Sequence, residues 1–354
     1  MTPIRTAIAG IGRAGWGMHC PELDKRPHLF TIVAACDIEP DRADKMRERY
    51  GCRSYADFAE MLADPAIELV SIATPSLLHV PQAVQALQAG KHVFLEKPIA
   101  LTLAGVEQLR RAAGQATGQL FFRHNRRFEP AFTHIREIIA SGILGWVYEI
   151  KLRRNRYQRR SDWQTLLTCG GGQLNNWGPH LIDHALRLLE SPVAGLWRDL
   201  KRTATVGDAE DHIKIVLTGE NGRVIDLEIS DGAALSEPEY IVLGDRGALI
   251  CQGDTITLRH LPTDYVLPDE RASADTPGMD YSFGKGGPLP WVSRAMPVAP
   301  STPCDLDSIW DHLYAAIRQG APFPITHEEA FGVVAVIEQI RRGSAFERTF
   351  DQAV

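Results

Sequence analysis

The sequence predicts an α/β protein of two domains. The first domain is expected to hold a doubly wound parallel sheet, because short apolar strands alternate with helix-length segments through the first third of the chain. The second is expected to be an α+β domain with a large, open, mostly antiparallel sheet, because strands from about residue 194 to 259 follow one another across glycine-containing turns. We place the domains at residues 1–123 and 124–354, with the last helices able to pack back on the first domain.

Composition limits the functional classes. Of the 354 residues 44% are hydrophobic and 23% charged, as in an ordinary soluble globular protein. The net charge of −6 gives no basic excess, so we expect no nucleic-acid partner. No apolar run reaches the roughly 18 residues of a membrane span, and Gly10 and Arg13 interrupt the first apolar strand too early for a signal-peptide core. Six scattered cysteines without a CxxC pair favour reduced thiols. We therefore expect a soluble, cytoplasmic protein with no membrane partner.

The first strand, about Ile4 to Ala9, leads directly into a glycine-rich turn before a helix. The turn reads G-x-G-x-x-G, which is typical of a dinucleotide-binding, or Rossmann, domain in this position. The first glycine allows the tight turn, the second lets the backbone approach a pyrophosphate, and the third allows close helix–strand packing. The pyrophosphate would lie on amide groups at the helix N-terminus. The candidate cofactor residues of this turn are Gly10, Gly12, Arg13, Ala14 and Gly15.

The second strand, about Phe30 to Cys36, ends at Asp37. An acidic side chain at this point accepts hydrogen bonds from the adenosine ribose hydroxyls. The alternative is that Asp37 only caps the next helix, although Asp41 could fill that role. A carboxylate here repels a 2′-phosphate and therefore favours NAD, while the nearby Arg42 leaves NADP as an alternative.

Two further strands, about Leu69 to Ala73 and His92 to Leu95, continue the predicted parallel sheet. Ligands bind beyond the carboxyl ends of such strands. By composition alone the favoured interpretation of Lys97 is a solvated lysine at a strand end. The candidate cofactor residues in the segments after these strands, and after the strand that ends at Phe122, are Thr74, Pro75, His79, Glu96, Lys97 and Asn125.

The stretch from Gly170 to Leu189 combines three glycines with an amphipathic helix that begins at about Pro179. His180 would lie in the first turn, where the helix dipole disfavours the imidazolium. A neutral histidine of this kind can take or give a proton near neutral pH. The alternative is a helix that is simply half-solvated. On a helical wheel the aliphatic residues fall on one side, and the polar residues on the other are His180, Asp183, His184 and Arg187.

These motifs occur in one order and at one spacing, and together they resemble the Gfo/Idh/MocA family of nicotinamide-dependent oxidoreductases. The resemblance covers nearly the whole chain and is carried by the glycine-rich turn, Thr74-Pro75, Glu96-Lys97-Pro98 and the Gly170–Asp183 stretch. It implies a Rossmann domain followed by an α/β domain whose large open sheet often mediates oligomerisation, and hence a homodimer or homotetramer. It also implies that Lys97 touches substrate and cofactor and that its bond to proline is often cis. By the same resemblance His180 is the acid/base, and Asp183 is a polar residue on the substrate side.

One position departs from the family's pattern. Many members carry an aspartate four residues before the acid/base histidine, where this chain has Asn176. An amide cannot hold a proton relay, but it can hydrogen-bond a sugar hydroxyl. Arg126, in the region that connects the domains, is a further candidate contact to the substrate, or part of a basic interdomain turn. Trp163 could pack against a sugar ring or in the core.

The resemblance implies an NAD(P)-dependent oxidoreductase that interconverts a secondary alcohol and a ketone on a small polyhydroxylated substrate, namely a sugar, cyclitol or related polyol. His180 would take the hydroxyl proton, and the Lys97 ammonium would stabilise alkoxide character. One alternative is an NAD-dependent lyase or hydrolase without net redox, and another is a non-catalytic dinucleotide-binding regulator. Metal binding by His180, Asp183 and His184 is less favoured than these, so we expect no metal site.

Two segments leave alternatives open. Residues 153–160 contain five arginines, which fits a solvated face or intersubunit salt bridges, or else an anionic substrate such as a sugar acid or phosphate. Residues 267–303 are rich in Pro, Gly, Ser and Asp, so they are expected to be disordered or to form a functional arm. Within them Tyr281, Phe283 and Trp291 suggest that the segment packs, and a subunit interface is one place for it to do so. The chain is expected to end in two helices, about Leu306 to Gln319 and His327 to Arg342.

Overall fold

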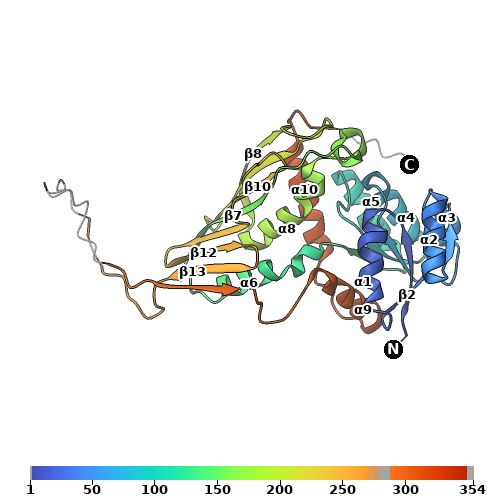
Figure 1. The fold of residues 1–354 in the computed structure, drawn as a ribbon, viewed down its shortest axis with the longest axis horizontal. Helices are drawn as coiled ribbons and strands as arrows, with labels where there is room; N and C mark the ends of the chain where they lie inside the picture. Colours follow the sequence, from blue (N-terminus) through green and yellow to red (C-terminus); the bar gives the residue numbers. More distant parts are fainter. Residues whose placement is uncertain are drawn as a thin grey trace.

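The computed structural model describes residues 2–269, 271, 272, 274, 276, 279 and 288–348, and it contains two sheets (Figure 1). The first sheet is parallel, with the strand order β3-β2-β1-β4-β5-β6. The direction of the order reverses between β1 and β4, and ligands bind at such a switch point. The expected doubly wound sheet is therefore confirmed, with strands β1 (Ile4–Ala9), β2 (Phe30–Cys36), β3 (Arg53–Tyr55), β4 (Leu69–Ile72), β5 (His92–Leu95) and β6 (Leu120–Phe122).

Helices cover this sheet, and its central strands are buried on both faces. Every residue of β4 is buried, which explains why the strand is a continuous apolar run rather than an alternating one. The helices of this domain are α1 (Cys20–Asp24), α2 (Pro40–Tyr50), α3 (Phe58–Leu62), α4 (His79–Gln88) and α5 (Leu103–Gln115), with the short turns η1 (Gly15–His19) and η2 (Ser76–Leu78).

The second sheet has the order β14-β13-β12-β11-β7-β10-β9-β8, and only the β7–β10 pair is parallel. Exposure alternates along β9, so one face packs on the core and the other is polar. The expected open, mostly antiparallel sheet is therefore confirmed. Its strands are β7 (Val147–Asn155), β8 (Val193–Lys201), β9 (His212–Gly219), β10 (Val224–Ser230), β11 (Tyr240–Gly244), β12 (Gly247–Gln252), β13 (Thr255–His260) and β14 (Val292–Pro297).

Two helices, α8 and α10, lie between the sheets (Figure 1). Helix α10 contributes Phe331 to the first hydrophobic core and Ile337 to the second. Helix α9 packs in the first core through Trp310 and Leu313, although it follows the second sheet in the chain. No helix in the described ranges is long and apolar enough to cross a bilayer. The remaining elements are α6 (Pro130–Ala140), α7 (Gln173–Asn176), α8 (Gly178–Leu189), α9 (Ile309–Gln319), α10 (His327–Arg341), η3 (Asn125–Phe128), η4 (Trp163–Thr165), η5 (Leu167–Cys169) and η6 (Leu306–Ser308).

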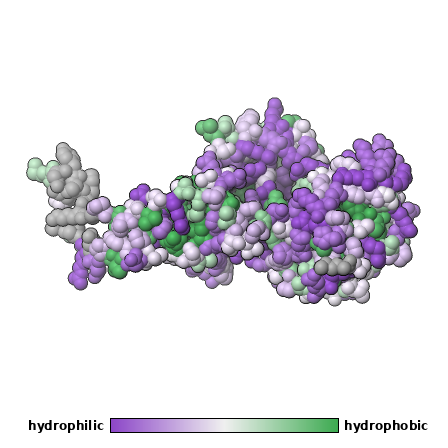
Figure 2. All heavy atoms as spheres, turned by 60° about the horizontal axis from the view of Figure 1, so that its bottom comes forward, coloured by the Kyte–Doolittle hydropathy of each residue, from purple (hydrophilic) through white to green (hydrophobic). Residues whose placement is uncertain are grey.

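Part of the 267–303 segment forms the strand β14, which pairs with β13 at the end of the sheet. The surrounding prolines and glycines hid this strand from the sequence pattern. Tyr281 and Phe283 lie outside the described residues. Apolar side chains gather on the narrow part of the molecule that this end of the sheet forms (Figure 2), and the exposed ones include Ile250, Leu289, Trp291 and Val292.

Candidate active site

The glycine-rich turn after β1 has the geometry of a dinucleotide cradle. Gly10 has a φ of +87°, and a Cβ there would lie 2.6 Å from the backbone nitrogen of Thr74, after β4. A Cβ on Gly15 would collide with the carbonyl oxygen of Gly10. A Cβ on Gly12, in contrast, would meet no protein atom within 4 Å. The protein itself requires the first and third glycines, while the second faces open space, as a turn that receives a pyrophosphate requires.

Asp37 lies beside this turn. Its Oδ2 accepts a hydrogen bond of 2.7 Å from the nitrogen of Ile11, and its Oδ1 accepts one of 3.0 Å from the nitrogen of Glu39. The guanidinium of Arg42 lies 3.6 Å from the same carboxylate, and about half of that side chain is exposed. Asp37 thus holds the backbone of the cradle at the place where the sequence predicts the ribose contact.

His79 joins the loops that follow β4 and β5. Its Nδ1 lies 2.7 Å from the carbonyl oxygen of Pro98, and its Nε2 lies 2.8 Å from that of Thr74. The peptide bond between Lys97 and Pro98 is cis. The buried imidazole therefore fixes the backbone around Thr74 and Pro75 to the loop that carries Lys97.

A buried network of charges lies beneath Lys97. Glu96 Oε1 accepts a 2.8 Å hydrogen bond from Arg123 and lies 3.0 Å from Nε2 of His19, while Oε2 accepts one of 3.0 Å from the nitrogen of Lys97. Arg123 also donates to Glu22 at 2.6 Å. Burial alone would raise the pKa of Glu96, but Arg123 and His19 hold it well below its ordinary value. Glu96 is thus a charged support for the backbone of Lys97.

Lys97 and His180 come together where the two domains meet. Lys97 Nζ donates to the backbone oxygen of Asn176 at 3.0 Å and to its Oδ1 at 3.3 Å. Asn176 ends α7, and His180 lies in the first turn of α8 with its ring edge-on to Trp177, at 5.9 Å between centroids. Within the described part of the chain, the buried Nδ1 of His180 has no hydrogen-bond partner. Three residues that the sequence singles out separately therefore share one site.

Burial and neighbouring cations set the charges there. Burial lowers the pKa of Lys97 to about 8, with Arg13 and Arg126 adding to the effect and Glu96 opposing it. Burial, with Lys97 and Arg126, also holds the pKa of His180 well below its ordinary value. The sequence attributes a neutral His180 to the helix dipole, whereas burial is the main cause. The site therefore holds a neutral imidazole beside an ammonium group.

On the polar side of α8, Asp183 and His184 are buried like His180 and only Arg187 is half-buried, so the half-solvated alternative is wrong for most of this face. Both carboxylate oxygens of Asp183 accept from Arg127, at 2.6 and 2.7 Å. His184 lies between the hydroxyl of Tyr240, at 3.1 Å, and the backbone oxygen of Arg126, at 2.9 Å. No cluster of three or more His, Cys, Asp or Glu side chains able to hold a metal ion occurs among the residues described.

The turn after β6 adds further residues to the site. Asn125 is buried, and the Arg126 guanidinium lies over the Trp177 ring at 4.3 Å. His124 was not singled out from the sequence; it is buried, and neither ring nitrogen has a partner among the residues the structure describes. Only its position directly after a strand of the parallel sheet could have indicated it. Trp163, on η4, is 39% exposed.

The three glycines before α7 pack against protein. Gly170 has a φ of +69°, and a Cβ there would lie 2.7 Å from Leu101. Gly172 has a φ of +103°, and its Cβ would collide with the carboxylate of Glu210. Glu210 accepts a 3.0 Å hydrogen bond from the nitrogen of Leu174, and burial raises its pKa to about 7. Gly170 and Gly172 thus make room for the buried side chains of Leu101 and Glu210, and Glu210 in turn holds the start of α7.

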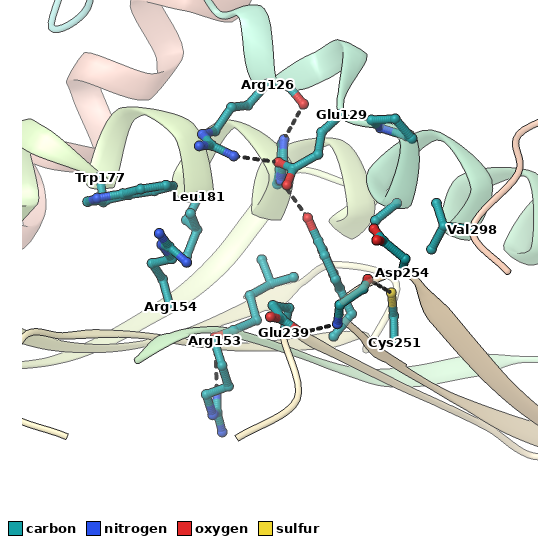
Figure 3. Close-up of a pocket in the computed structure, with 16 residues that line it drawn as sticks. Arg126, Glu129, Arg153, Arg154, Trp177, Leu181, Glu239, Cys251, Asp254 and Val298 are labelled. Carbon is teal, nitrogen blue, oxygen red and sulfur yellow. Dashed lines mark hydrogen bonds and ion pairs between the residues drawn. The ribbon is translucent and has the colours of Figure 1, made fainter. Parts of the chain in front are cut away.

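A cavity of about 290 Å³ opens beside Trp177, between the helices α6 and α8 and the inner face of the second sheet (Figure 3). Trp163 does not line it. Its walls include Arg126, Arg154, Trp177, Leu181, Tyr240 and Cys251.

The fold and the site together define a class of protein. A parallel sheet with a glycine cradle at its switch point and a lysine after one of its strands, covered by a second domain that brings a histidine to the same place, is the arrangement of a dinucleotide-binding oxidoreductase.

Comparison with known proteins identifies the family. Residues 4–124 match the model of the oxidoreductase family with an NAD-binding Rossmann fold, and residues 132–250 match the GFO/IDH/MocA C-terminal domain. The chain belongs to the Gfo/Idh/MocA family of oxidoreductases, and its first domain binds a nicotinamide dinucleotide. The resemblance found from the motifs is confirmed.

Several relatives match much of the chain. The scyllo-inositol 2-dehydrogenase (NADP(+)) IolW of Bacillus subtilis is 28% identical over 98% of this chain and 95% of its own. The uncharacterized oxidoreductase YdgJ of Escherichia coli is 30% identical over 75% and 76% of the two chains, and the D-glucoside 3-dehydrogenase of that organism is 30% identical over 54% and 55%. The solved structure of an NAD-binding protein from Listeria innocua shares the fold, with a TM-score of 0.81 at 23% identity over 96% of this chain and 94% of the other.

Proposed function

We propose that the protein interconverts a secondary alcohol and a ketone on a sugar, cyclitol or related polyol, with NAD(P) as the hydride carrier. The observation that carries this proposal is the neutral, buried His180 beside the Lys97 ammonium at the junction of the domains. Two relatives, named as dehydrogenases of an inositol and of a glucoside, support a polyol substrate.

Lys97 and His180 divide the proton chemistry between them. The neutral imidazole of His180 accepts the hydroxyl proton when the alcohol is oxidised, and it returns that proton in the reverse direction. The Lys97 ammonium donates a hydrogen bond to the same oxygen and stabilises negative charge on it. Asn176 orients the ammonium through its backbone and side-chain oxygens. The Asn at this position therefore keeps Lys97 in place without adding a second titrating group.

The residues around the cradle fit a nicotinamide dinucleotide. When bound, its nicotinamide accepts or supplies the hydride. Gly10, Gly12, Arg13, Ala14 and Gly15 would hold the pyrophosphate, and Thr74, Pro75 and Asn125 would border the nicotinamide end.

Asp37 would favour NAD, because a carboxylate beside the ribose repels a 2′-phosphate. Arg42 lies within reach of the same place and would accept NADP, the cofactor in the name of IolW.

For Asp183 we propose a role different from the substrate contact expected of it. Since Arg127 occupies both of its carboxylate oxygens, we assign it to positioning α8 and so His180. Trp163, outside the cavity beside Trp177, has less support as a substrate contact than Arg126, which lines it.

The outer face of the second sheet is proposed to pair with another copy of the chain, as a homodimer or homotetramer. Trp197 on β8 is 56% exposed, and Ile250 on β12 is 42% exposed beside its cross-strand neighbour Ile241. Apolar side chains at such positions gain from a partner surface.

The test is the absorbance of reduced nicotinamide, measured with NAD and then NADP against inositols, aldoses, glycosides and sugar acids. We expect a signal with one group of substrates and none from a Lys97→Ala variant that still binds dinucleotide. If the wild-type protein holds NAD tightly and converts a glycoside without accumulating NADH, the redox proposal is wrong and the lyase or hydrolase alternative replaces it.

A further inference from the structure

Arg154 occupies an unusual place in the second sheet. Along β7 alternate residues share a face, so Arg154 follows Ile150 and Leu152 on the side that packs on the core. Its partner in the register of β10 is Ile229, which is completely buried. A cation therefore stands where the pattern of the sheet calls for an apolar side chain.

Three of the four other arginines in the run 153–160 pair with carboxylates, whereas Arg154 has no carboxylate partner among the described residues. No residue in the described ranges accepts a hydrogen bond from it, and its Nε is buried. A buried N–H group without an acceptor is costly, unless a ligand or water satisfies it. The paired neighbours in the run are Arg153 with Asp226 at 2.7 Å, Arg156 with Asp231 at 2.8 Å and Arg160 with Asp162 at 2.5 Å.

The surroundings of Arg154 connect it to the active site. Its guanidinium lies 4.1 Å from the Trp177 ring, and the Arg126 guanidinium lies 4.3 Å from the same ring. Figure 3 shows the two arginines on opposite sides of the indole. The indole in turn contacts His180. Burial, with Arg156 and Arg126, lowers the pKa of Arg154, so this cation lies among like charges.

We propose that the cavity beside Trp177 is a subsite for a carboxylate of the substrate, with Arg154 as its main ligand and Arg126 as a second cation. This proposal rests on the proposed function and narrows its substrates to sugar acids. A guanidinium presents its N–H groups in the fork that a carboxylate accepts.

The same cavity argues against a phosphate. Glu129, Glu239 and Asp254 also line it, and Arg126 already donates to Glu129 at 3.0 Å. The unpaired guanidinium of Arg154 balances the single negative charge of a carboxylate. A phosphate carries nearly two negative charges, so the neighbouring carboxylates would repel it more strongly.

The test uses ligands that differ only in the group at carbon 6: a hydroxymethyl group, a carboxylate or a phosphorylated hydroxymethyl group. A methyl hexopyranoside, the corresponding methyl uronoside and the 6-phosphate are titrated by calorimetry into the full-length protein saturated with NADH, in the gluco, galacto and manno configurations. With the anomeric carbon blocked, every secondary alcohol of these ligands is a ring hydroxyl. The same titrations are run on Arg154→Met, which keeps a long apolar stem over Trp177. The matched control is Arg159→Met, since Arg159 is exposed in the same run.

In at least one configuration we expect the uronoside to bind about ten- to a hundredfold more tightly than the neutral glycoside, as a charge-assisted hydrogen bond provides. That ratio should fall toward one in Arg154→Met and stay unchanged in Arg159→Met. A ratio near one in every wild-type titration overturns the proposal, as do an unchanged ratio in Arg154→Met, tightest binding of the phosphate, and no binding of any uronoside.

The outcome is separable from that of the proposed function. Binding is measured without turnover, so a uronoside preference that depends on Arg154 supports the subsite even if no NADH forms with NAD. NADH formation from neutral polyols alone, with no Arg154-dependent preference, supports the dehydrogenase and overturns the subsite.

Discussion

At the scale of the single residue, the charge of Lys97 is finely balanced. Burial and the neighbouring arginines disfavour the ammonium, while the buried carboxylate of Glu96 favours it, and the result is a pKa of about 8. Because this pKa lies close to neutral pH, a small change in the surroundings of Lys97 can change the fraction of the side chain that is protonated. The buried pair of Glu96 and Arg123 therefore helps to set the charge of Lys97, although no hydrogen bond joins either side chain to Lys97 Nζ among the described residues.

Replacing Lys97 with Met is expected to lower kcat by roughly a hundred- to ten-thousandfold, the range of a lost acid–base group, since alkoxide character would no longer be stabilised. Dinucleotide binding should persist, because the glycine cradle is intact. Turnover and fluorescence titration with NADH measure the two effects. Lys45→Met, on an exposed position of α2, is the control. Unchanged turnover in Lys97→Met would contradict the proposed role.

Asn176→Asp tests the balance of charge directly. A carboxylate beside Nζ favours the ammonium, so the pKa of Lys97 should rise from about 8. Activity that requires the ammonium falls as pH rises through that pKa, and its alkaline limb should therefore move to higher pH in the variant. The pH profile of kcat/KM is compared with that of Gln88→Glu, an equal charge change at an exposed site of α4. A limb that does not move would mean that another group titrates.

At the scale of the element, α8 is held by charge as well as by packing. Asp183 on α8 binds Arg127, and Arg127 donates at 2.6 Å to Glu329 on α10. The three residues join the turn after β6, α8 and α10, and they fix the helix whose first turn carries His180.

Removing one partner of the buried pair of Arg127 and Asp183 should lower the free energy of unfolding more than removing both. Asp183→Asn is expected to lower the free energy of unfolding by about 3 kcal/mol, because it leaves Arg127 partly uncompensated. The double variant Arg127→Met/Asp183→Leu should recover part of that loss. Denaturant unfolding of Asp183→Asn and of the double variant compares the two losses in free energy of unfolding. If Asp183→Asn instead abolished turnover at unchanged stability, Asp183 would be a substrate contact after all.

Gly172→Ala should destabilise α7, the helix that ends at Asn176. The residue has a φ of +103°, and its Cβ would collide with Glu210, so we expect a loss of roughly 1–3 kcal/mol in unfolding free energy. Gly332→Ala is the matched control: Gly332 lies inside α10 with no atom within 4 Å of the added Cβ, and the change should stabilise by roughly 0.5–1 kcal/mol. Equal effects at both sites would show that strain at Gly172 is absent.

Local sequence signals predicted most of these elements. The glycine cradle and the amphipathic α8 could be predicted because each depends on residues that are close together in the sequence: the glycines of the turn, and apolar residues at helical spacing. The clamp between Arg127 and Asp183 could not, because the partners lie 56 residues apart. The strand β14 was missed because its pairing with β13, rather than its own pattern, makes it a strand. For Arg154 the sequence left open whether an arginine of the run faces solvent or a ligand, and only the register of β7 places it inward.

At the scale of the whole molecule, the outer face of the second sheet is proposed to bury Trp197 and Ile250 against another copy of the chain. We expect wild-type protein to sediment as a dimer or tetramer, and Trp197→Arg to shift it toward the monomer, because a charge would be desolvated in the contact. Leu103→Arg, at an exposed position of α5, should leave the assembly unchanged. A monomeric wild-type protein, or an assembly that Trp197→Arg does not weaken, would contradict this interface.

The return of α9 to the first core has a consequence for how the chain is made. Trp310 is fully buried against Phe30 and Phe94, and its Nε1 donates to Glu22 at 2.6 Å. During synthesis the nucleotide-binding half leaves the ribosome long before this tryptophan exists, so its apolar pocket stays open until the second sheet has also emerged. Apolar surface that is exposed in this way makes a partly folded chain prone to aggregate. A chimera that exchanges the nucleotide-binding half at residue 123 must therefore bring its own α9.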